Sequence, residues 1–217
     1  TALSYARLTG HCEALAGIME HHGIQSLALH TDNGLDWLIT DFTCQNLDIC
    51  LLPLPNFFSI SQLQHALSSS PVDAIITDNS ALPGLFENIA EQCSIEIVGE
   101  LLLIVFTPED NKPLLPESTG KITYTSGSTG TPKGVCLSNE QLIKQAQALA
   151  DTVSVPQPRH LCLLPLSTLL ENVAGVYAPL LASGEVVVPT LGEIGFTGSS
   201  SISPNKIISI ISQFQPT

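Results

Sequence analysis

The sequence predicts an α/β protein with a mostly parallel sheet flanked by helices. The main observation is that short β-rich runs alternate with helical stretches along most of the 217 residues, which is typical of βαβ units and a parallel sheet. Hydrophobic residues make up 44% of the chain and charged residues 12%, so the composition is that of a folded protein. A chain of this length can bury a sizeable core and forms one large domain, or one domain with an extension.

The clearest unit lies between residues 26 and 52. A β-rich run at 26–30, a helix from about 33 to 45 and a second run at 49–52 predict a β-α-β unit with a right-handed crossover. Asp32 stands where it can act as the N-cap of that helix. A first helix precedes the unit, because residues 11–22 carry apolar side chains at i, i+3 and i+4.

Further elements continue the alternation up to the end of the chain. Residues 107–119 are polar and rich in proline, which predicts a surface connector. Ser138 and Gln141 can form a capping box for a helix that runs to about 151. The other expected elements are a helix near 59–69, a strand at 73–78, a helix near 81–92, strands near 95–98, 101–106 and 121–126, a strand near 160–164, a helix near 169–182, a strand at 185–189, a loop of Gly and Ser at 192–203 and a helix near 205–213. Residues 192–201 of that loop are interpreted as a flexible connector.

Charge and hydropathy exclude several classes of protein. The net charge is −13 and rests on only seven Lys and Arg, whereas nucleic-acid and anionic-membrane binding need clustered cations. Apolar runs such as 101–106 are too short to span a bilayer, and the first residues lack the apolar region of a signal peptide. Six scattered cysteines without C-x-x-C spacing indicate buried thiols in a reducing compartment, so we expect a cytoplasmic protein.

Residues 121–138, KITYTSGSTGTPKGVCLS, form the one stretch whose composition points to chemistry. A loop that holds a polyphosphate needs inward backbone N–H groups, hydroxyl donors and a cation, and glycine permits the required turns. The glycines of this stretch are Gly127, Gly130 and Gly134, the hydroxyl donors are Thr125, Ser126, Ser128 and Thr129, and the cation is Lys133. The stretch therefore predicts a phosphate-binding loop, with a mobile Gly/Ser hairpin as the alternative.

The loop does not fit the Walker A motif of nucleotide kinases. Counting from Gly127, the second glycine position holds Pro132, and Lys133 is followed by Gly134 instead of Ser or Thr. The STGK run at 118–121 lacks the first glycine as well. A P-loop kinase or ATPase is thereby disfavoured, and no G-x-S-x-G motif supports a hydrolase.

From Tyr124 to Val135 the loop resembles, position by position, the phosphate-binding signature of the adenylate-forming enzymes, which include acyl-CoA synthetases, luciferases and the adenylation domains of peptide synthetases. Weaker resemblance covers residues 3–10, 32–67 and 164–188, the last being most similar to long-chain acyl-CoA synthetases. The resemblance implies that residues 1–217 are the N-terminal portion of an AMP-binding domain, with 107–119 as connector and 124–135 as phosphate loop.

The motifs that complete such an enzyme are not found in the sequence. There is no Tyr-Gly-x-Thr-Glu segment for Mg²⁺, no Thr-Gly-Asp segment for ribose and no C-terminal catalytic lysine. The chain also stops where a further strand is due. We therefore expect a fragment that lacks the C-terminal half and the lid domain and is inactive alone.

The resemblance implies roles for individual residues. Lys133 would be the catalytic cation, and Thr125 would be a ligand to Mg²⁺. Ser167 and Thr168 would line the acyl pocket, although the family usually has His or an aromatic residue at the position of Thr168. Glu171 and Asn172 match the long-chain branch, and a capping role on the surface is as well supported for them as a site role. The phosphates of ATP would be held by Thr125, Ser126, Gly127, Ser128, Thr129, Gly130 and Lys133.

The implied activity is the ATP-dependent conversion of a carboxylic acid into acyl-AMP and then acyl-CoA. The resemblance to long-chain acyl-CoA synthetases implies that the acid is a fatty acid. ATP, Mg²⁺ and CoA as co-substrate follow from this activity. Two alternatives stay open at this point. One is a non-catalytic module that binds phosphate or a partner, and the other is an adenylation domain that feeds a carrier protein instead of CoA.

Other polar residues have structural interpretations. His21 and His22 end the first helix, where a histidine favours the helix dipole, so a capping role is preferred over a metal site. His160 precedes a strand and is read as a residue at the core edge. Asp32, Asp36, Asp41 and Asp48 are predicted to be solvated surface residues.

Overall fold

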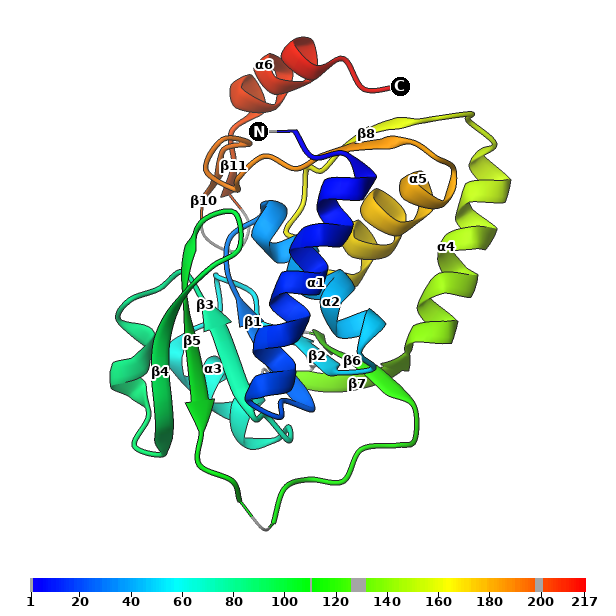
Figure 1. Ribbon diagram of the computed structural model, residues 1–217. Helices are drawn as coiled ribbons and strands as arrows, with labels where there is room; N and C mark the ends of the chain where they lie inside the picture. Colours follow the sequence, from blue (N-terminus) through cyan, green and yellow to red (C-terminus); the bar gives the residue numbers. More distant parts are fainter. Residues whose placement is uncertain (1, 110, 126–131, 198–200) are drawn as a thin grey trace. The chain divides into compact units, whose positions relative to one another are not determined.

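The computed structural model describes residues 2–109, 111–125, 132–197 and 201–217, and Figure 1 shows their elements. The chain divides into two compact units. Unit 1 contains residues 1–31 and 35–137, and unit 2 contains residues 32–34 and 138–217. Each unit has a hydrophobic core of its own.

Unit 1 is built on a seven-stranded sheet with the order β4-β5-β3-β1-β2-β6-β7. β1 pairs in parallel with β2 and β3, and β2 pairs in parallel with β6. β5 is antiparallel to both β3 and β4 at one edge of the sheet. The parallel pairs of β1, β2, β3 and β6 confirm the predicted mostly parallel sheet. The strands are β1 (Ser26–His30), β2 (Cys50–Pro53), β3 (Ala74–Thr77), β4 (Ile89–Glu96), β5 (Glu100–Phe106), β6 (Thr119–Thr125) and β7 (Lys133–Ser138).

Helices cover both faces of this sheet. In Figure 1, α1 (Tyr5–His21) and α2 (Leu35–Asn46) lie in front of the strands and α3 (Ile60–Ser68) lies behind them. Leu63 and Ala66 of α3 belong to one buried cluster with Ala28 and Ile75. Ala28 and Ile75 are register partners on neighbouring strands, so their side chains share the face that α3 covers. The central strands are buried throughout because both faces are covered.

The prediction of a helix near 81–92 is wrong. A short 3-10 helix, η1 (Leu82–Leu85), is followed by the strand β4, which forms an antiparallel pair with β5. Pro83 and Gly84 stand inside the expected helix, where proline removes a hydrogen-bond donor and glycine costs backbone entropy. The following residues gain ladder hydrogen bonds by pairing with β5, so tertiary pairing decides their structure.

The interpretation of Asp36 and Asp41 as solvated residues is also wrong. Asp41 is fully buried, and its carboxylate lies 2.6 Å from Lys121 Nζ, which is buried too. Asp36 accepts hydrogen bonds from the backbone N–H groups of Val98 at 2.7 Å and Gly99 at 3.1 Å. Asp48 is exposed, as predicted. Two of these carboxylates therefore fix α2 to other parts of unit 1.

Unit 2 begins with α4 (Asn139–Val153), whose predicted capping box between Ser138 and Gln141 is confirmed. The parallel pair β8 (Arg159–Leu161) and β9 (Glu185–Val187) follows the prediction as well. The expected helix near 169–182 is present as a π-helix, η2 (Glu171–Tyr177), that continues into an α-helix. The remaining elements are α5 (Ala178–Leu181), β10 (Phe196–Thr197), β11 (Ser201–Ile202) and α6 (Pro204–Phe214).

Residues 32–34 belong to unit 2 through their side chains. Asn33 donates to the carbonyl of Leu164 at 2.9 Å and accepts from the N–H of Leu166 at 2.8 Å. Asp32 accepts from the N–H of Asn33 and from that of Leu191. Because α2 begins at Leu35, Asp32 does not occupy its N-cap position, and the prediction of that role is wrong.

The expected loop at 192–203 contains the two short strands β10 and β11. β10 and β11 pair antiparallel, and residues 198–200 lie outside the described residues. Among the described helices, none is both long and apolar enough to cross a membrane.

Candidate functional site

The candidate site is the segment between β6 and β7, which carries the phosphate-loop motif. Thr125 is the last residue of β6 and Lys133 the first residue of β7. Ser126, Gly127, Ser128, Thr129 and Gly130 lie outside the described residues, so their predicted phosphate contacts stay predictions. The structure instead shows how the two stems of the loop are held.

Tyr124 fixes the stem that enters the loop. Its hydroxyl donates to the carbonyl of Ala66 at 3.1 Å and lies 2.7 Å from the hydroxyl of Ser69 and 3.1 Å from that of Ser70. These groups belong to the last turn of α3 and the residues just after it. The ring of Tyr124 also packs edge-on against Phe58, with 6.4 Å between ring centroids. The end of β6 is thereby tied to α3.

His65 fixes the stem that leaves the loop. Its Nε2 lies 3.1 Å from the carbonyl oxygen of Pro132. A carbonyl oxygen can only accept, so Nε2 carries the proton in this contact. His65 belongs to α3, and the same helix therefore anchors both stems. No pattern in the sequence indicates this role, because the partner is a backbone carbonyl 67 residues away.

Gly134 permits the close approach of β7 to β6. A Cβ atom at this position would lie 3.0 Å from Ile122 Cγ2 and 3.3 Å from Tyr124 Cζ. These distances are shorter than comfortable carbon–carbon contacts. Glycine at 134 therefore has a packing reason in addition to its place in the motif.

Thr125 and Lys133 present a hydroxyl and an ammonium group at the mouth of the loop. Both residues are exposed, and the Thr125 hydroxyl makes one long contact of 3.4 Å to the Lys133 carbonyl. Within the described part of the chain, no carboxylate pairs with Lys133. The two side chains are thus free to meet a ligand from solvent, as a phosphate site requires.

Ser167 and Thr168, the predicted acyl-pocket residues, lie in the turn before η2 and are half-buried. Thr168 donates its hydroxyl to the carbonyl of Pro165 at 2.7 Å, and its N–H bonds the same oxygen at 2.9 Å. These bonds define the turn. The acyl-pocket role of both residues stays a prediction.

Glu171 and Asn172 are buried, which contradicts the surface-capping alternative. Glu171 Oε1 lies 2.8 Å from His160 Nε2, and Oε2 accepts from the N–H of Leu164 at 3.1 Å. A Cβ on Gly175 would lie 2.2 Å from Glu171 Oε1 and 2.7 Å from His160 Nε2, so a larger residue there would have to displace this pair. Burial, and then the nearby Glu171, raises the pKa of the Cys162 thiol. The cluster fastens η2 to β8.

A profile of AMP-binding enzymes matches residues 1–198. The chain belongs to this family. Its relatives include both acyl-CoA synthetases and peptide synthetases. Long chain acyl-CoA synthetase 6 of Arabidopsis thaliana is 26% identical over an alignment of 188 residues, and the match covers 73% of this chain and 27% of that protein. Gramicidin S synthase 2 of Brevibacillus brevis is 26% identical over an alignment of 196 residues, and the match covers 87% of this chain and 4% of that protein.

The fold of this AMP-binding chain matches solved structures of the family. O-succinylbenzoate coenzyme A synthetase of Bacillus subtilis, solved with ATP and magnesium, superposes with a TM-score of 0.72 at 19% identity. The match covers 100% of this chain and 56% of that chain. This AMP-binding chain therefore spans about half of that synthetase and less than a third of the plant enzyme.

Proposed function

We propose that this chain supplies the ATP-phosphate-binding portion of a ligase that activates a carboxylic acid to acyl-AMP and then to acyl-CoA. The observation that carries the proposal is the phosphate-loop motif of an AMP-binding family member, with both of its stems anchored on α3. Residues 1–217 would form the N-terminal portion of the adenylation domain, with 107–119 as connector and 124–135 as phosphate loop. A cytoplasmic location is part of the same proposal.

The residues at the loop fit ATP and Mg²⁺. The exposed hydroxyl of Thr125 and the exposed ammonium of Lys133 supply a neutral oxygen ligand and a cation, which suit Mg²⁺ and phosphate respectively. Ser126, Gly127, Ser128, Thr129 and Gly130 would add backbone and hydroxyl donors. Bound Mg²⁺ would neutralise further phosphate charge.

The reaction asks mainly for positioning and charge stabilisation from these residues. A carboxylate oxygen of the acid attacks the α-phosphorus of ATP, a new acyl–phosphate bond forms, and the bond to the leaving pyrophosphate breaks. Negative charge then builds on the pyrophosphate, where Lys133 would stabilise it. Ser167 and Thr168 would contact the acid.

The acceptor of the acyl group divides the proposal from its alternative. Transfer to CoA is supported by the resemblance of residues 164–188 to long-chain acyl-CoA synthetases. The similarity to gramicidin S synthase 2 supports an adenylation domain that serves a carrier protein. We favour CoA and a fatty acid because the likeness around Glu171 and Asn172 is to the long-chain branch.

The test is acid-dependent exchange of pyrophosphate into ATP by the natural full-length protein. We expect Lys133→Ala to slow exchange by about 10²-fold or more, as removal of a charge-stabilising donor does in other enzymes. Lys144→Ala is the matched control, because Lys144 is an exposed lysine of α4 with no place in the loop, and it should exchange at the normal rate. Equal rates in all three proteins would refute the role of the loop.

Three further outcomes separate the alternatives. Release of acyl-CoA when CoA is added identifies a CoA ligase, whereas loading of a carrier domain without acyl-CoA identifies the adenylation alternative. ATP binding without exchange for any acid, from short chains to fatty acids, would favour the non-catalytic phosphate-binding module.

A further inference from the structure

Three side chains with metal-binding chemistry meet where α1 ends beside the edge strand β4. His22 is the C-cap residue of α1, and Glu91 and Cys93 belong to β4. Residues two apart on a strand point to the same face, so the carboxylate and the thiol face the histidine together. A ring nitrogen of His22, a carboxylate oxygen of Glu91 and the Sγ of Cys93 all lie within 4.8 Å of one another.

We propose that His22, Glu91 and Cys93 bind a divalent cation of the zinc class. His22 Nδ1 lies 3.5 Å from Glu91 Oε2, which is longer than the ~2.7–3.2 Å of a good hydrogen bond. It is close to the separation of about 3.3 Å that follows for nitrogen and oxygen ligands at ~2.0–2.1 Å from a tetrahedral zinc ion. The spacing therefore suits a shared cation better than a direct bond.

A second cluster of the same residue types shows the contrast. His160, Cys162 and Glu171 also bring their ligand atoms within 4.8 Å of one another. There the imidazole and the carboxylate are 2.8 Å apart, which is a direct hydrogen bond, and the thiol is fully buried. The other oxygen of Glu171 is occupied by the N–H of Leu164. That cluster is satisfied without a metal, whereas in the His22 cluster the Glu91 carboxylate is exposed.

The surroundings of the His22 cluster suit a cation that enters from solvent. The His22 side chain is 12% exposed and that of Glu91 is 55% exposed. One ligand is thus held by packing while another can adjust to the ion. A β-bulge lies between Ile89 and Glu91, and bulges re-aim the side chains beside them. Three protein ligands leave a fourth position for water.

The donor set selects the chemical class of the ion. One imidazole nitrogen, one thiolate sulfur and one carboxylate oxygen suit zinc and its neighbours, whereas Mg²⁺ and Ca²⁺ prefer oxygen alone. The bound ion would tie the C-terminal end of α1 to β4. This inference is independent of the proposed ligase activity, because none of the three residues belongs to the phosphate loop.

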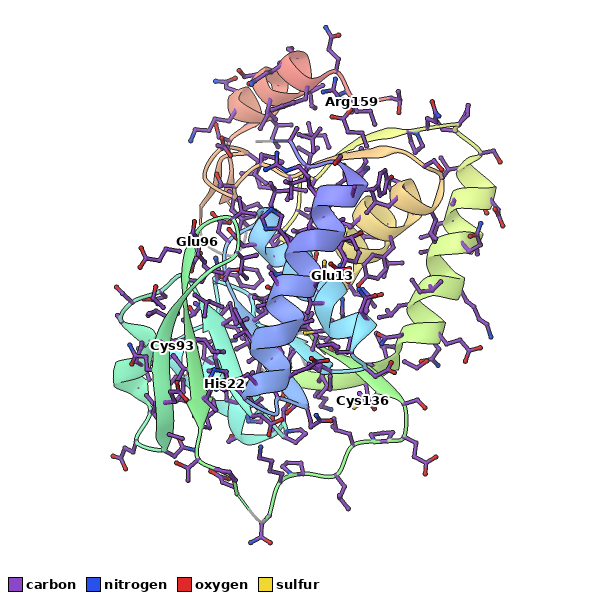
Figure 2. All side chains as sticks on the ribbon, in the orientation of Figure 1. Glu13, His22, Cys93, Glu96, Cys136 and Arg159 are labelled. Atoms are coloured by element: carbon purple, nitrogen blue, oxygen red, sulfur yellow. The ribbon has the colours of Figure 1, made fainter. Side chains whose placement is uncertain are left out.

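The test is titration of the protein with Co²⁺, a spectroscopic substitute for zinc, under reducing conditions without competing thiols. A bound thiolate gives a near-ultraviolet charge-transfer band, which should saturate at a single equivalent and disappear when Zn²⁺ is added. Cys93→Ser and His22→Asn should remove the band, and Glu91→Gln should weaken it. Figure 2 labels His22 and Cys93 together with two control positions, Cys136 and Glu96.

The controls match the ligands in type and exposure. Cys136 is a half-buried thiol of β7, and Glu96 is an exposed carboxylate of β4. Cys136→Ser and Glu96→Gln should keep the band unchanged. Circular dichroism would establish that each variant folds. As a second measurement on the unmodified protein, Zn²⁺ should protect Cys93 but not Cys136 from alkylation, as read by peptide mass.

The outcomes decide the matter. A saturable band that depends on Cys93 and His22, with selective protection of Cys93, supports the site. No band, a band that survives Cys93→Ser, or a band lost with Cys136→Ser would overturn it. In those cases His22 and Glu91 form an ordinary ion pair beside an unrelated thiol.

Discussion

The ion pair between Asp41 and Lys121 gives the sharpest test of how unit 1 is held together. Asp41 comes from α2 and Lys121 from β6, with 2.6 Å between carboxylate and ammonium. Both side chains are almost fully buried, at 0% and 1% exposure. Lys121 Nζ also lies 5.7 Å from the ring centroid of Trp37. Lys121→Met keeps the length of the side chain and removes its charge, which leaves the Asp41 carboxylate buried without its cation.

Removing one partner of a buried ion pair costs about 3–5 kcal/mol, because the other charge remains desolvated. The free energy of unfolding of a whole domain is roughly 5–15 kcal/mol, so this single change would remove a large share of the stability. The double variant Asp41→Asn/Lys121→Met leaves no buried charge at either position. We expect its unfolding free energy to lie closer to that of the unmodified protein than to that of Lys121→Met.

Urea denaturation followed by tryptophan fluorescence measures these free energies, since Trp37 is the single tryptophan and is buried next to the pair. Lys144→Met provides the control, because Lys144 pairs with Glu140 on the exposed face of α4 and exposed pairs contribute little. A loss of less than about 1 kcal/mol for Lys121→Met, or a double variant less stable than Lys121→Met alone, would refute the assigned role of the pair.

Three further predictions follow from other contacts. His65→Ala removes the N–H that bonds the Pro132 carbonyl. We expect the free energy of urea unfolding to fall by about 0.5–1.5 kcal/mol and the KM for ATP of the natural full-length protein to rise. An unchanged KM would mean that the contact does not position the loop. Ser138→Ala removes the capping box of α4 and should cost about 1 kcal/mol, whereas no change in the unfolding midpoint would contradict that capping role. Burial acts to raise the pKa of Asp73, but hydrogen bonds from Lys112 and backbone N–H groups outweigh it and hold the pKa below its usual value. A carboxyl with a lowered folded pKa contributes stability above its unfolded pKa of about 3.9, and this stability is lost as the pH falls further. Asp73→Asn should therefore flatten the acid side of a pH–stability curve, and an unaltered slope would argue against this role of Asp73.

The parts of the fold that could be predicted from the sequence are those whose signal is local. The run at 26–30 and the segment 73–78 are apolar and short, and both are strands at the centre of the sheet. Ser138 and Gln141 stand three residues apart, and their capping box needs no distant partner. By contrast, residues 89–96 become a strand because β5 pairs with them, and no property of the segment alone announces that pairing.

The same limit applies to polar residues. The sequence places Asp41 on a helix and Lys121 after a connector, and their separation of 80 residues hides the ion pair. An aspartate on an amphipathic helix is usually solvated, so the prediction failed where a buried charge found a distant cation. The surface-capping interpretation of Glu171 was wrong for a similar reason, since its partner His160 lies on the neighbouring strand.

The candidate site combines both situations. Its motif is continuous in the sequence and was therefore visible, whereas the contacts that hold its stems come from α3, more than fifty residues earlier. Tyr124 and His65 bond opposite ends of the loop to a single rigid helix. A loop that must hold several phosphate oxygens at once gains from such anchoring, because less ordering entropy is lost when the ligand binds. The motif alone, moved to another strand–loop–strand segment without α3, should therefore bind ATP phosphates more weakly than it does here.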